Sequence, residues 1–363
     1  MPLVDLNLNK NPFRDVDPSR GSTDLVWAGM TSLKGKIERS YQECLSDDSK
    51  QMVLNWGPYG GGKTFSAYYF IKQYLDQPSL TQIYLRSPKD GIKTTKEFIK
   101  SVIDDLTFDK IHAHISSLVE RHGESVFIQL LTPKATSEFA KAIALIGSND
   151  EPTKQLMNRF LYSGLTKTEL RKIGLAKDLQ SDSDAVKFLS GLLACYAGEP
   201  DIYSGKLVLW LDEMEDIIYY AQKNYRAFSQ ILRDLFDSFS GNVLIFLNFT
   251  LAEGEEQTIE VILGGALWSR ITKKIRYVEI TEAEALLYVN DLLGTAKIDQ
   301  RSDSPFTQPI LSELIRTIPR NSLTPREINK CFSSVIGYSV RHHAQVIDTS
   351  LINGWAGERE EDN

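Results

Sequence analysis

The order of hydrophobic and polar positions along the chain predicts alternating strands and helices, which is typical of an α/β protein. Short apolar runs bounded by polar or turn residues predict strands, and they lie at 51–56, 81–86, 206–213, 242–248 and 276–280. Between Leu207 and Leu211 the apolar residues follow one another without alternation. Such a run is expected of a strand that is buried on both faces of a parallel sheet.

Longer stretches with a helical period separate these strands and follow the last one. Within 92–200, one helix face would carry the side chains of Phe98, Ile99, Val102, Ile103 and Leu106. Further helices are predicted at 64–75, 136–146, 154–163, 167–174, 184–197 and 256–269, and throughout 281–350. Two helix starts have the spacing of a capping box: Thr281 with Glu284, and Thr324 with Glu327.

Composition places the protein among ordinary globular chains. Of its 363 residues, 42% are hydrophobic and 25% are charged, which are usual values for a soluble domain. No apolar run is long enough to span a bilayer, and the first residues lack the basic and apolar regions of a signal peptide. Cys44, Cys195 and Cys331 are isolated, without a metal-binding or redox spacing. We therefore expect a cytoplasmic protein with reduced cysteines and no membrane partner.

One segment carries a complete phosphate-binding pattern, G-x-x-x-x-G-K-[ST]. It consists of Gly57, Pro58, Tyr59, Gly60, Gly61, Gly62, Lys63 and Thr64. Glycines allow the backbone to curl until its N–H groups point at the phosphates of a nucleoside triphosphate. Lys63 can then reach the β- and γ-phosphates, and the Thr64 hydroxyl can ligate Mg²⁺. The strand predicted before the segment and the helix predicted after it favour ATP binding over a chance match in a glycine-rich turn.

Two carboxylates, Asp212 and Glu213, end the strand predicted at 206–213. In parallel α/β sheets, ligands bind at the carboxyl ends of the strands. We expect Asp212 to hold the Mg²⁺ shell and Glu213 to orient or deprotonate the attacking water. The alternative is an acidic strand end that faces solvent, and the phosphate-binding loop favours the catalytic interpretation over it. Glu215 and Asp216 are interpreted as solvated residues at a helix start.

The order of these elements resembles that of AAA+ ATPases. A phosphate-binding loop is followed by a long gap, an Asp-Glu strand, a strand ending at Asn248, a helix before Arg270, and a helical lid carrying Arg326. The chain looks closest to the initiator and origin-recognition side of that family. It also resembles bacterial AAA ATPases that begin with an Asn-Pro-Phe lead-in, which stands here at 11–13. The resemblance covers roughly residues 26–340.

This resemblance implies roles for three further residues. Asn248 corresponds to sensor 1, which lies beside the γ-phosphate and the attacking water. Arg270 corresponds to an arginine finger that completes the ATP site of a neighbouring subunit, and the alternatives for this role are Lys273, Lys274 and Arg276. Arg326 corresponds to the lid arginine, sensor 2, with a surface ion pair as the alternative. The predicted catalytic residues are therefore Lys63, Glu213, Asn248 and Arg270.

The chain departs from the family pattern in two places. The gap between Lys63 and Asp212 exceeds that of a compact AAA+ core, so we expect 92–200 to be a specialised helical insertion. Met30 stands where relatives often carry an arginine near the adenine. Contacts of Trp27 and Gly29 with adenine are therefore a weaker expectation, and packing of Trp27 within the protein is the alternative.

These considerations divide the chain into four parts. We expect an extended lead-in at 1–25, a P-loop ATPase core at 26–280, a helical lid domain at 281–352 and an acidic tail at 353–363. The expected fold class is an α/β P-loop NTPase of the AAA+ type, with a parallel-sheet core. Whether the insertion at about 92–200 is a separate domain or an elaboration of the core stays open at this point.

The resemblance implies a homo-oligomeric ATPase that uses ATP and Mg²⁺ and loads or remodels a nucleic-acid or nucleoprotein partner. Roles in mobile elements or antiphage defence follow from the bacterial lead-in alone. The net charge of −7 argues against a generally basic, DNA-coating surface. The alternative function is therefore a slow nucleotide-dependent switch that recruits a protein effector without contacting DNA. A small-molecule kinase is a third interpretation, less suited to paired carboxylates that activate water.

Overall fold

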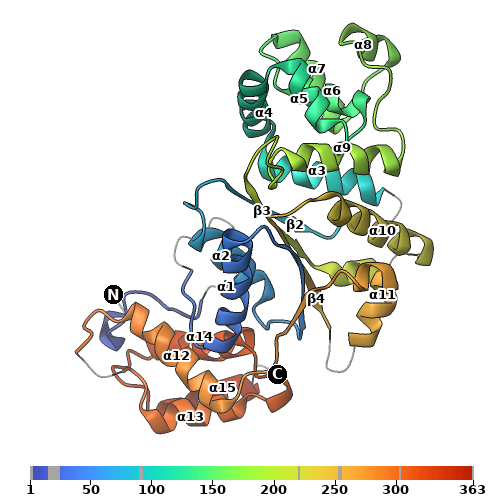
Figure 1. Ribbon diagram of the computed structural model, residues 1–363. Coiled ribbons are helices and arrows are strands. Elements are labelled where there is room, and N and C mark those ends of the chain that lie inside the picture. Colours follow the sequence, from blue (N-terminus) through green and yellow to red (C-terminus); the bar gives the residue numbers. More distant parts are fainter. Residues whose placement is uncertain are drawn as a thin grey trace. The chain divides into compact units, whose positions relative to one another are not determined.

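The computed structural model describes residues 3–14, 25–89, 93–219, 221–251, 256–301 and 304–361 (Figure 1). The chain divides into two units, and each unit combines segments that are distant in sequence. Unit 1 comprises Met1–Lys36, Gly57–Lys72 and Arg276–Asn363, and unit 2 comprises Ile37–Trp56 and Gln73–Ile275. No helix among the described residues is long and apolar enough to cross a bilayer.

A five-stranded sheet forms the centre of unit 2. Its strands are β1 (Lys50–Gly57), β2 (Leu80–Arg86), β3 (Lys206–Asp212), β4 (Val243–Thr250) and β5 (Lys273–Arg276). Their order across the sheet is β2-β3-β4-β1-β5, and β3 pairs in parallel with both β2 and β4. This arrangement confirms the predicted α/β fold class and four of the five predicted strand positions.

The fifth strand lies earlier in the chain than predicted, at Lys273–Arg276 instead of 276–280. Pairing with β1 begins just before it, where Thr272 N–H donates to the carbonyl of Met52 at 2.8 Å. In the strand itself only Ile275 is fully buried. A short edge strand with one buried residue has no apolar run, and this explains why the hydrophobic pattern misplaced it.

Strands β3 and β4 are central and almost completely buried, as the uninterrupted apolar run predicted. The rings of Trp210 and Phe246 stack across them with centroids 3.8 Å apart. Trp210 Nε1 donates to the hydroxyl of Tyr41 at 2.9 Å, and this hydroxyl donates to Gln82 Oε1 at 2.9 Å. The buried polar atoms of the central aromatic residues are therefore hydrogen-bonded, as the interior of a sheet requires.

Seven helices of unit 2 fill the long gap between β2 and β3. They are α3 (Thr94–Leu106), α4 (Phe108–His122), α5 (Glu124–Leu131), α6 (Ser137–Ile146), α7 (Glu151–Tyr162), α8 (Lys167–Lys172) and α9 (Asp182–Ala194). The last four confirm the helices predicted there, and each begins with a side chain that accepts a backbone N–H: Thr136, Asp150, Thr166 and Ser181. Such N-caps satisfy donors that a helix start leaves open.

The helical insertion shares its hydrophobic core with the sheet. The predicted apolar face of α3 is buried from Phe98 to Leu106, and it belongs to the same cluster as β3 and β4. Figure 1 shows α3 and α9 lying between the sheet and the remaining helices of the insertion. One continuous core indicates that the insertion elaborates the α/β core and is not an independent domain.

Besides the strands, the described residues of unit 2 after β3 form η2 (Met214–Tyr219), α10 (Gln222–Ser238) and α11 (Glu256–Trp268). Helix α11 is interrupted at Gly264, whose φ of 73° lies in the left-handed region. Helix α1 (Thr31–Ser46) begins in unit 1 and continues into unit 2. It supplies Tyr41 to the central aromatic group of the sheet.

Unit 1 has a second hydrophobic core built from helices. Its elements are η1 (Val4–Leu6), α2 (Lys63–Gln73, up to Lys72), α12 (Glu282–Ala296), α13 (Gln308–Thr317), η3 (Arg320–Ser322), α14 (Pro325–Arg341) and α15 (Thr349–Glu361). Thr281 and Glu284 form the predicted capping box. At α14, Thr324 accepts from the backbone of Glu327 and Pro325 occupies the first turn.

The two ends of the described chain are more ordered than the sequence predicts. Leu6, Leu8 and Phe13 of the lead-in are buried in the helical core of unit 1, and Leu8 pairs with Lys297 in an isolated β-bridge. Residues 15–24 of the lead-in lie outside the described residues. Helix α15 continues to Glu361, and thus into the segment expected to be an acidic tail.

Candidate nucleotide site

The phosphate-binding loop follows β1 directly and leads into α2, as predicted. Gly60 and Gly62 have φ values of 78° and 95°, which L side chains rarely adopt. At Gly57 a side chain is excluded for a second reason, because an added Cβ would lie 2.0 Å from the carbonyl oxygen of Tyr277. The glycines of the pattern are thus required by the backbone path of the loop.

Lys63 is the first residue of α2 and is only 5% exposed. Its ammonium group donates to the carbonyl oxygens of Gly57 at 2.9 Å and Pro58 at 2.8 Å. The adjacent Thr64 is half-buried in the same turn. Because both residues begin a helix, the positive end of its dipole lies at the loop. A lysine, a hydroxyl and a helix N-terminus are therefore combined in one place, and together they suit an anionic ligand.

The predicted lid arginine lies against this loop within unit 1. Arg326 is in the first turn of α14, and its backbone N–H donates to the carbonyl of Gly60 at 3.4 Å. Its guanidinium carbon lies 4.2 Å from the centroid of the Tyr59 ring. The structure thus brings together the loop and Arg326, two parts of the site that are far apart in sequence.

Trp27 packs within unit 1, which favours the second of the two interpretations given for this residue. Its ring lies 5.1 to 5.8 Å from those of Tyr69, Phe65 and Phe70 on α2. Its Nε1 donates to the carbonyl of Gly29 at 2.9 Å. The N–H of Gly29 is held by Asp291 Oδ2 at 2.8 Å. These contacts attach the segment before α1 to α2 and α12.

In unit 2, Asp212 is 3% exposed and its two carboxylate oxygens have separate donors. The phenol of Tyr84 donates to Oδ2 at 2.7 Å, and the amide of Asn248 donates to Oδ1 at 3.1 Å. Asn248 in turn accepts a hydrogen bond of 2.9 Å from Asn55 Nδ2. Asn55 Oδ1 is buried with no hydrogen-bond partner among the described residues. Four polar side chains from β1, β2, β3 and β4 therefore form one network at the sheet.

Two members of this network, Tyr84 and Asn55, were missed by the sequence analysis. Asn55 interrupts the apolar pattern of β1, and a buried amide in a central strand is a signal that could have identified it. Asn248 lies within β4, which extends two residues beyond it to Thr250. The structure thus brings Asn248 to Asp212, although Asn248 does not end the strand as predicted.

Glu213, the residue after Asp212, has an unusual backbone conformation. Its φ of 56° is in the left-handed region, which is costly for a residue with a side chain. Its carboxylate lies 3.8 Å from Nε of Arg86, the residue in register with Asp212 on β2. The left-handed turn directs Glu213 away from the strand path, so the two successive carboxylates have different surroundings.

Glu215 is not the solvated residue that the sequence analysis expected. It is half-buried, and its Oε2 accepts a hydrogen bond of 2.8 Å from the backbone N–H of Thr250. The physical reason is that the chain after β3 turns through η2 toward the end of β4, which offers an unpaired backbone donor.

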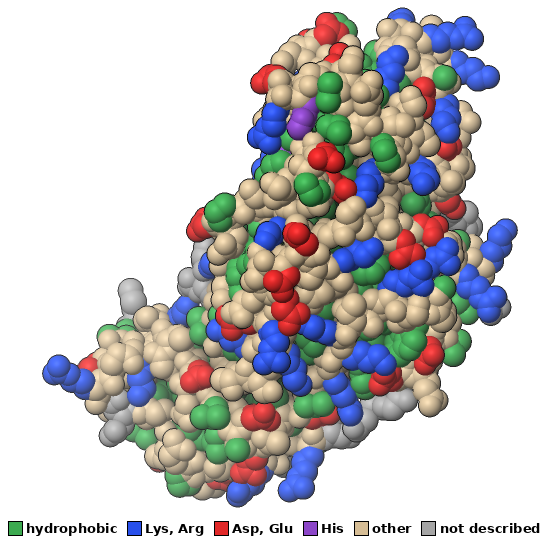
Figure 2. All heavy atoms as spheres, in the orientation of Figure 1, with side chains coloured by type: hydrophobic (Ala, Val, Ile, Leu, Met, Phe, Trp, Pro, Cys, Tyr) green, Lys and Arg blue, Asp and Glu red, His purple; other side chains and the backbone are tan. Residues whose placement is uncertain are grey.

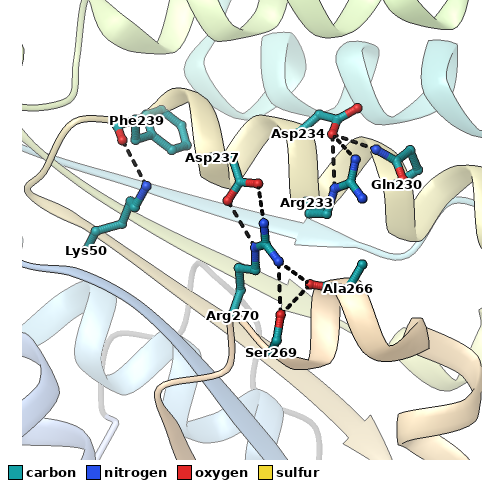
Figure 3. A network of polar contacts seen from close by, with 9 residues as sticks. All are labelled: Lys50, Gln230, Arg233, Asp234, Asp237, Phe239, Ala266, Ser269 and Arg270. Atoms are coloured by element: carbon teal, nitrogen blue, oxygen red, sulfur yellow. Dashed lines mark hydrogen bonds and ion pairs between the residues drawn. The ribbon is translucent and has the colours of Figure 1, made fainter.

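Arg270 takes part in a polar network within its own chain (Figure 3). Its Nε and Nη2 donate to the two carboxylate oxygens of Asp237 at 3.2 and 2.8 Å, and Nη1 donates to Ala266 O and Ser269 Oγ at 2.9 Å. Hydrogen bonding to Arg270 lowers the pKa of Asp237, and the same contact raises the pKa of Arg270. A bidentate pair of this kind joins α10 to the end of α11.

Two of the three alternatives to Arg270, Lys273 and Lys274, also have ion-pair partners in unit 2. Lys273 pairs with Glu43. Lys274 pairs with Glu256 at 2.7 Å and lies 4.1 Å from the ring of Trp268. Arg270 differs from both lysines because its partner holds it through two parallel hydrogen bonds.

The sheet order and the phosphate-binding loop after β1 define the α/β fold that was predicted from the sequence. Comparison with solved structures supports the same fold. The Aeropyrum pernix ORC1 protein in complex with DNA superposes with a TM-score of 0.51 at 13% identity, over 98% of this chain and 70% of that one. The ADP form of the ORC2 protein from the same organism gives 0.54 at 9% identity, over 95% and 72%.

A second ORC2 structure, which contains ADPNP and ADP, gives a TM-score of 0.50 at 10% identity, over 95% of this chain and 71% of that one. No protein-family model matches the sequence, and no characterised protein matches it in a sequence search. The TM-scores support a common fold, whereas identities this low say nothing of the substrate or partners, which must be argued from the chemistry of the residues.

Proposed function

We propose that this protein binds ATP and hydrolyses it with the help of Mg²⁺. The observation that carries the proposal is the loop from Gly57 to Thr64, with its buried Lys63 at the start of α2 and Arg326 beside it. A glycine-rich backbone, a lysine and a helix N-terminus together form an anion site suited to a triphosphate. The fold in which the loop lies is one that binds nucleotides in two of the similar structures, according to their names.

On this proposal, the loop N–H groups and Lys63 bind the β- and γ-phosphates. Thr64 and Asp212 are the residues that would hold Mg²⁺, which neutralises phosphate charge when bound. Their chemistry fits this ion, because Mg²⁺ prefers oxygen ligands and retains several waters. Asp212 offers carboxylate oxygens, and Tyr84 and Asn248 hold this carboxylate through hydrogen bonds of 2.7 and 3.1 Å.

Glu213 is the residue we propose to orient or deprotonate the attacking water. Its carboxylate is partly exposed, whereas that of Asp212 is buried. A buried carboxylate held by two donors suits charge compensation, and an accessible one suits exchange of a proton with water. Asn248, which donates to Asp212, is proposed to fix that carboxylate and to contribute to the placement of the γ-phosphate.

We further propose that the active form is a homo-oligomer in which Arg270 completes the site of a neighbouring subunit. The partner would be a nucleic acid or nucleoprotein that the ATPase loads or remodels, with or without a protein effector. The presence of DNA in the similar ORC1 structure supports this choice. A role in mobile elements or antiphage defence rests on the Asn-Pro-Phe lead-in alone.

A slow ATP-dependent switch that recruits a protein effector is the second candidate function. Surface charge is the observation that favours it. On the face drawn in Figure 2, Lys and Arg side chains alternate with Asp and Glu side chains and form no field of one sign. The net charge of −7 has the same implication. Proteins that track along DNA generally present a clearer basic surface.

The decisive experiment measures steady-state ATP hydrolysis over a range of protein concentrations, with duplex DNA, single-stranded DNA or no DNA. Glu213→Gln is the blank, because it removes the base and leaves the phosphate-binding loop intact. Turnover that rises cooperatively with concentration and responds to DNA is expected from the proposed oligomeric ATPase. Slow turnover that is independent of concentration and DNA would instead support the switch, and absence of any ATP binding would exclude both.

A further inference from the structure

Tyr59 occupies a variable position of the phosphate-binding pattern, yet its side chain makes a specific contact. The residue is 69% exposed, and the guanidinium carbon of Arg326 lies 4.2 Å from the centroid of its ring. This distance is well within the range in which a cation is attracted by the negative face of an aromatic ring. The pair joins the first half of the loop to the first turn of α14, within unit 1.

The backbone of Gly60, next to Tyr59, also packs closely against Arg326. Arg326 N–H donates to the carbonyl of Gly60. A Cβ added to Gly60 would lie 2.7 Å from Cβ of Arg326 and 3.1 Å from the hydroxyl of Thr324. Only a glycine therefore permits the helix start to approach the loop this closely. The approach of the backbone brings the guanidinium over the ring, since Tyr59 directly precedes Gly60.

We propose that Tyr59 is the positioning residue for Arg326, and that its ring face holds the guanidinium beside the phosphate-binding loop. The inference rests on the proposed ATP binding and adds a role for a side chain that the motif leaves undefined. An arginine has many rotamers, and fixing one in advance reduces the entropy lost when a phosphate binds. A cation over an aromatic face keeps its charge, so the contact with Tyr59 does not itself compete with binding of a phosphate.

The proposal predicts that ATP affinity depends on the aromatic ring of Tyr59 and not on its hydroxyl. Tyr59→Leu keeps an apolar side chain but removes the aromatic face, and we expect ATP affinity to fall about two- to fivefold. Tyr59→Phe and Tyr59→Trp keep a ring and are expected to restore most of that loss. In Arg326→Ala, the Tyr59→Leu change should have no further effect, because the group that the ring positions is already absent.

The experiment is a double-mutant cycle on Tyr59→Leu and Arg326→Ala, measured with a fluorescent ATP analogue and by steady-state hydrolysis. Leu287→Ala is the control for loss of an exposed apolar side chain in the same unit, since Leu287 is 59% exposed. A positioning role predicts coupling in the dissociation constant and in KM. An additive cycle, or equal losses in Tyr59→Leu and Tyr59→Phe, would overturn it.

A second cycle on the same variants separates this inference from the proposed function. It measures unfolding by urea in the absence of nucleotide, where the ring–guanidinium contact itself should appear as a coupling between the two substitutions. If the wild-type protein failed to bind the ATP analogue, the proposed function would fail and the positioning role with it, even where this cycle showed the contact. If ATP bound normally but both cycles were additive, only the role of Tyr59 would be overturned.

Discussion

The phenol of Tyr84 on β2 donates a hydrogen bond of 2.7 Å to Oδ2 of Asp212 at the end of β3. Both side chains are at least nine-tenths buried, so this bond lies in a medium where charge is poorly screened. With Asn248 on the opposite oxygen, Tyr84 fixes the plane of the carboxylate. The orientation of the proposed Mg²⁺-holding residue is therefore set by a residue outside every recognised motif of the chain.

Replacing Tyr84 by Phe should reveal this bond in two measurements. A hydrogen bond to a charged group contributes about 1.5–3 kcal/mol, so we expect the free energy of unfolding to fall by roughly that amount. We also expect hydrolysis to require a higher Mg²⁺ concentration, because the carboxylate can rotate. Urea unfolding and an Mg²⁺ titration of ATP turnover measure the two effects. Tyr288→Phe is the matched control, since this buried phenol donates to the neutral Asn329 at 3.0 Å; an equal Mg²⁺ shift in both variants would contradict the prediction.

Asn248→Asp tests the same network from its other side. The new carboxylate would stand about where the amide now lies, 3.1 Å from Asp212. Two adjacent buried carboxylates cannot both ionise easily, so the pair holds a proton to higher pH than in the unfolded chain. The folded state then binds more protons, and stability should decrease as the pH rises above about 4. Urea unfolding between pH 4 and 8 measures it.

A second substitution should rescue that variant. Asn248→Asp combined with Asp212→Asn leaves one carboxylate in the network and should remove the added pH dependence. A double variant that kept the full pH dependence of Asn248→Asp would show that its origin lies elsewhere in the protein.

The loop and the central strands were predictable from sequence because each is a local pattern. The spacing of Gly57, Lys63 and Thr64 encodes backbone curvature and charge within eight positions, and the run through Trp210 encodes burial on two faces. The position of Asp212 at a strand end follows from the same run. These predictions need no knowledge of what lies nearby in space.

The partners of these residues were not predictable, since they depend on strand order and tertiary approach. Tyr84 reaches Asp212 because β2 is the neighbour of β3, which the sequence order of the strands does not state. The ion pair of Arg270 with Asp237 joins two helices whose packing no periodicity describes. Likewise β5 was misplaced because a short edge strand buries only Ile275 and carries almost no hydrophobic signal.

Gly60 and Gly62 offer a matched pair for testing the contact between the loop and α14. Both have positive φ, so alanine at either position should cost about 1–2 kcal/mol of backbone strain. At Gly60 the added Cβ also meets Arg326 at 2.7 Å, whereas at Gly62 nothing lies within 4 Å. We expect Gly60→Ala to be the more destabilising of the two in urea unfolding. Equal losses would mean that α14 does not restrict the loop.

The pairing of Asp237 with Arg270 makes a directional prediction about acid stability. The pKa of Asp237 is lowered in the folded protein, chiefly by its hydrogen bonds to Arg270. A depressed carboxyl pKa contributes stability above the unfolded value of about 3.9, and this contribution is lost as the pH falls. Asp237→Asn should therefore lower the denaturation midpoint at pH 7 and have less effect at pH 3. Unfolding curves measured at both pH values test this prediction, and Asp234→Asn on the same helix is the control.

The proposed action of Arg270 in a neighbouring subunit can be tested by mixing two inactive variants. Arg270→Ala retains its own phosphate-binding loop and Glu213, whereas Glu213→Gln retains Arg270. An arginine supplied in trans accelerates phosphoryl transfer by about 10³–10⁵-fold in other nucleotide hydrolases. Subunits of Glu213→Gln should therefore restore turnover to subunits of Arg270→Ala, to an extent that rises with total concentration.

The control for this mixture carries both substitutions, Glu213→Gln and Arg270→Ala, and should restore nothing. Because Asp237 holds the guanidinium through two hydrogen bonds, transfer of Arg270 to a neighbour requires that pair to open. Asp237→Asn should accordingly increase complementation when combined with Glu213→Gln. If the mixture stayed inactive at every concentration while wild-type protein hydrolysed ATP, Arg270 would be a structural link between α10 and α11, and the trans-acting residue would have to be sought elsewhere.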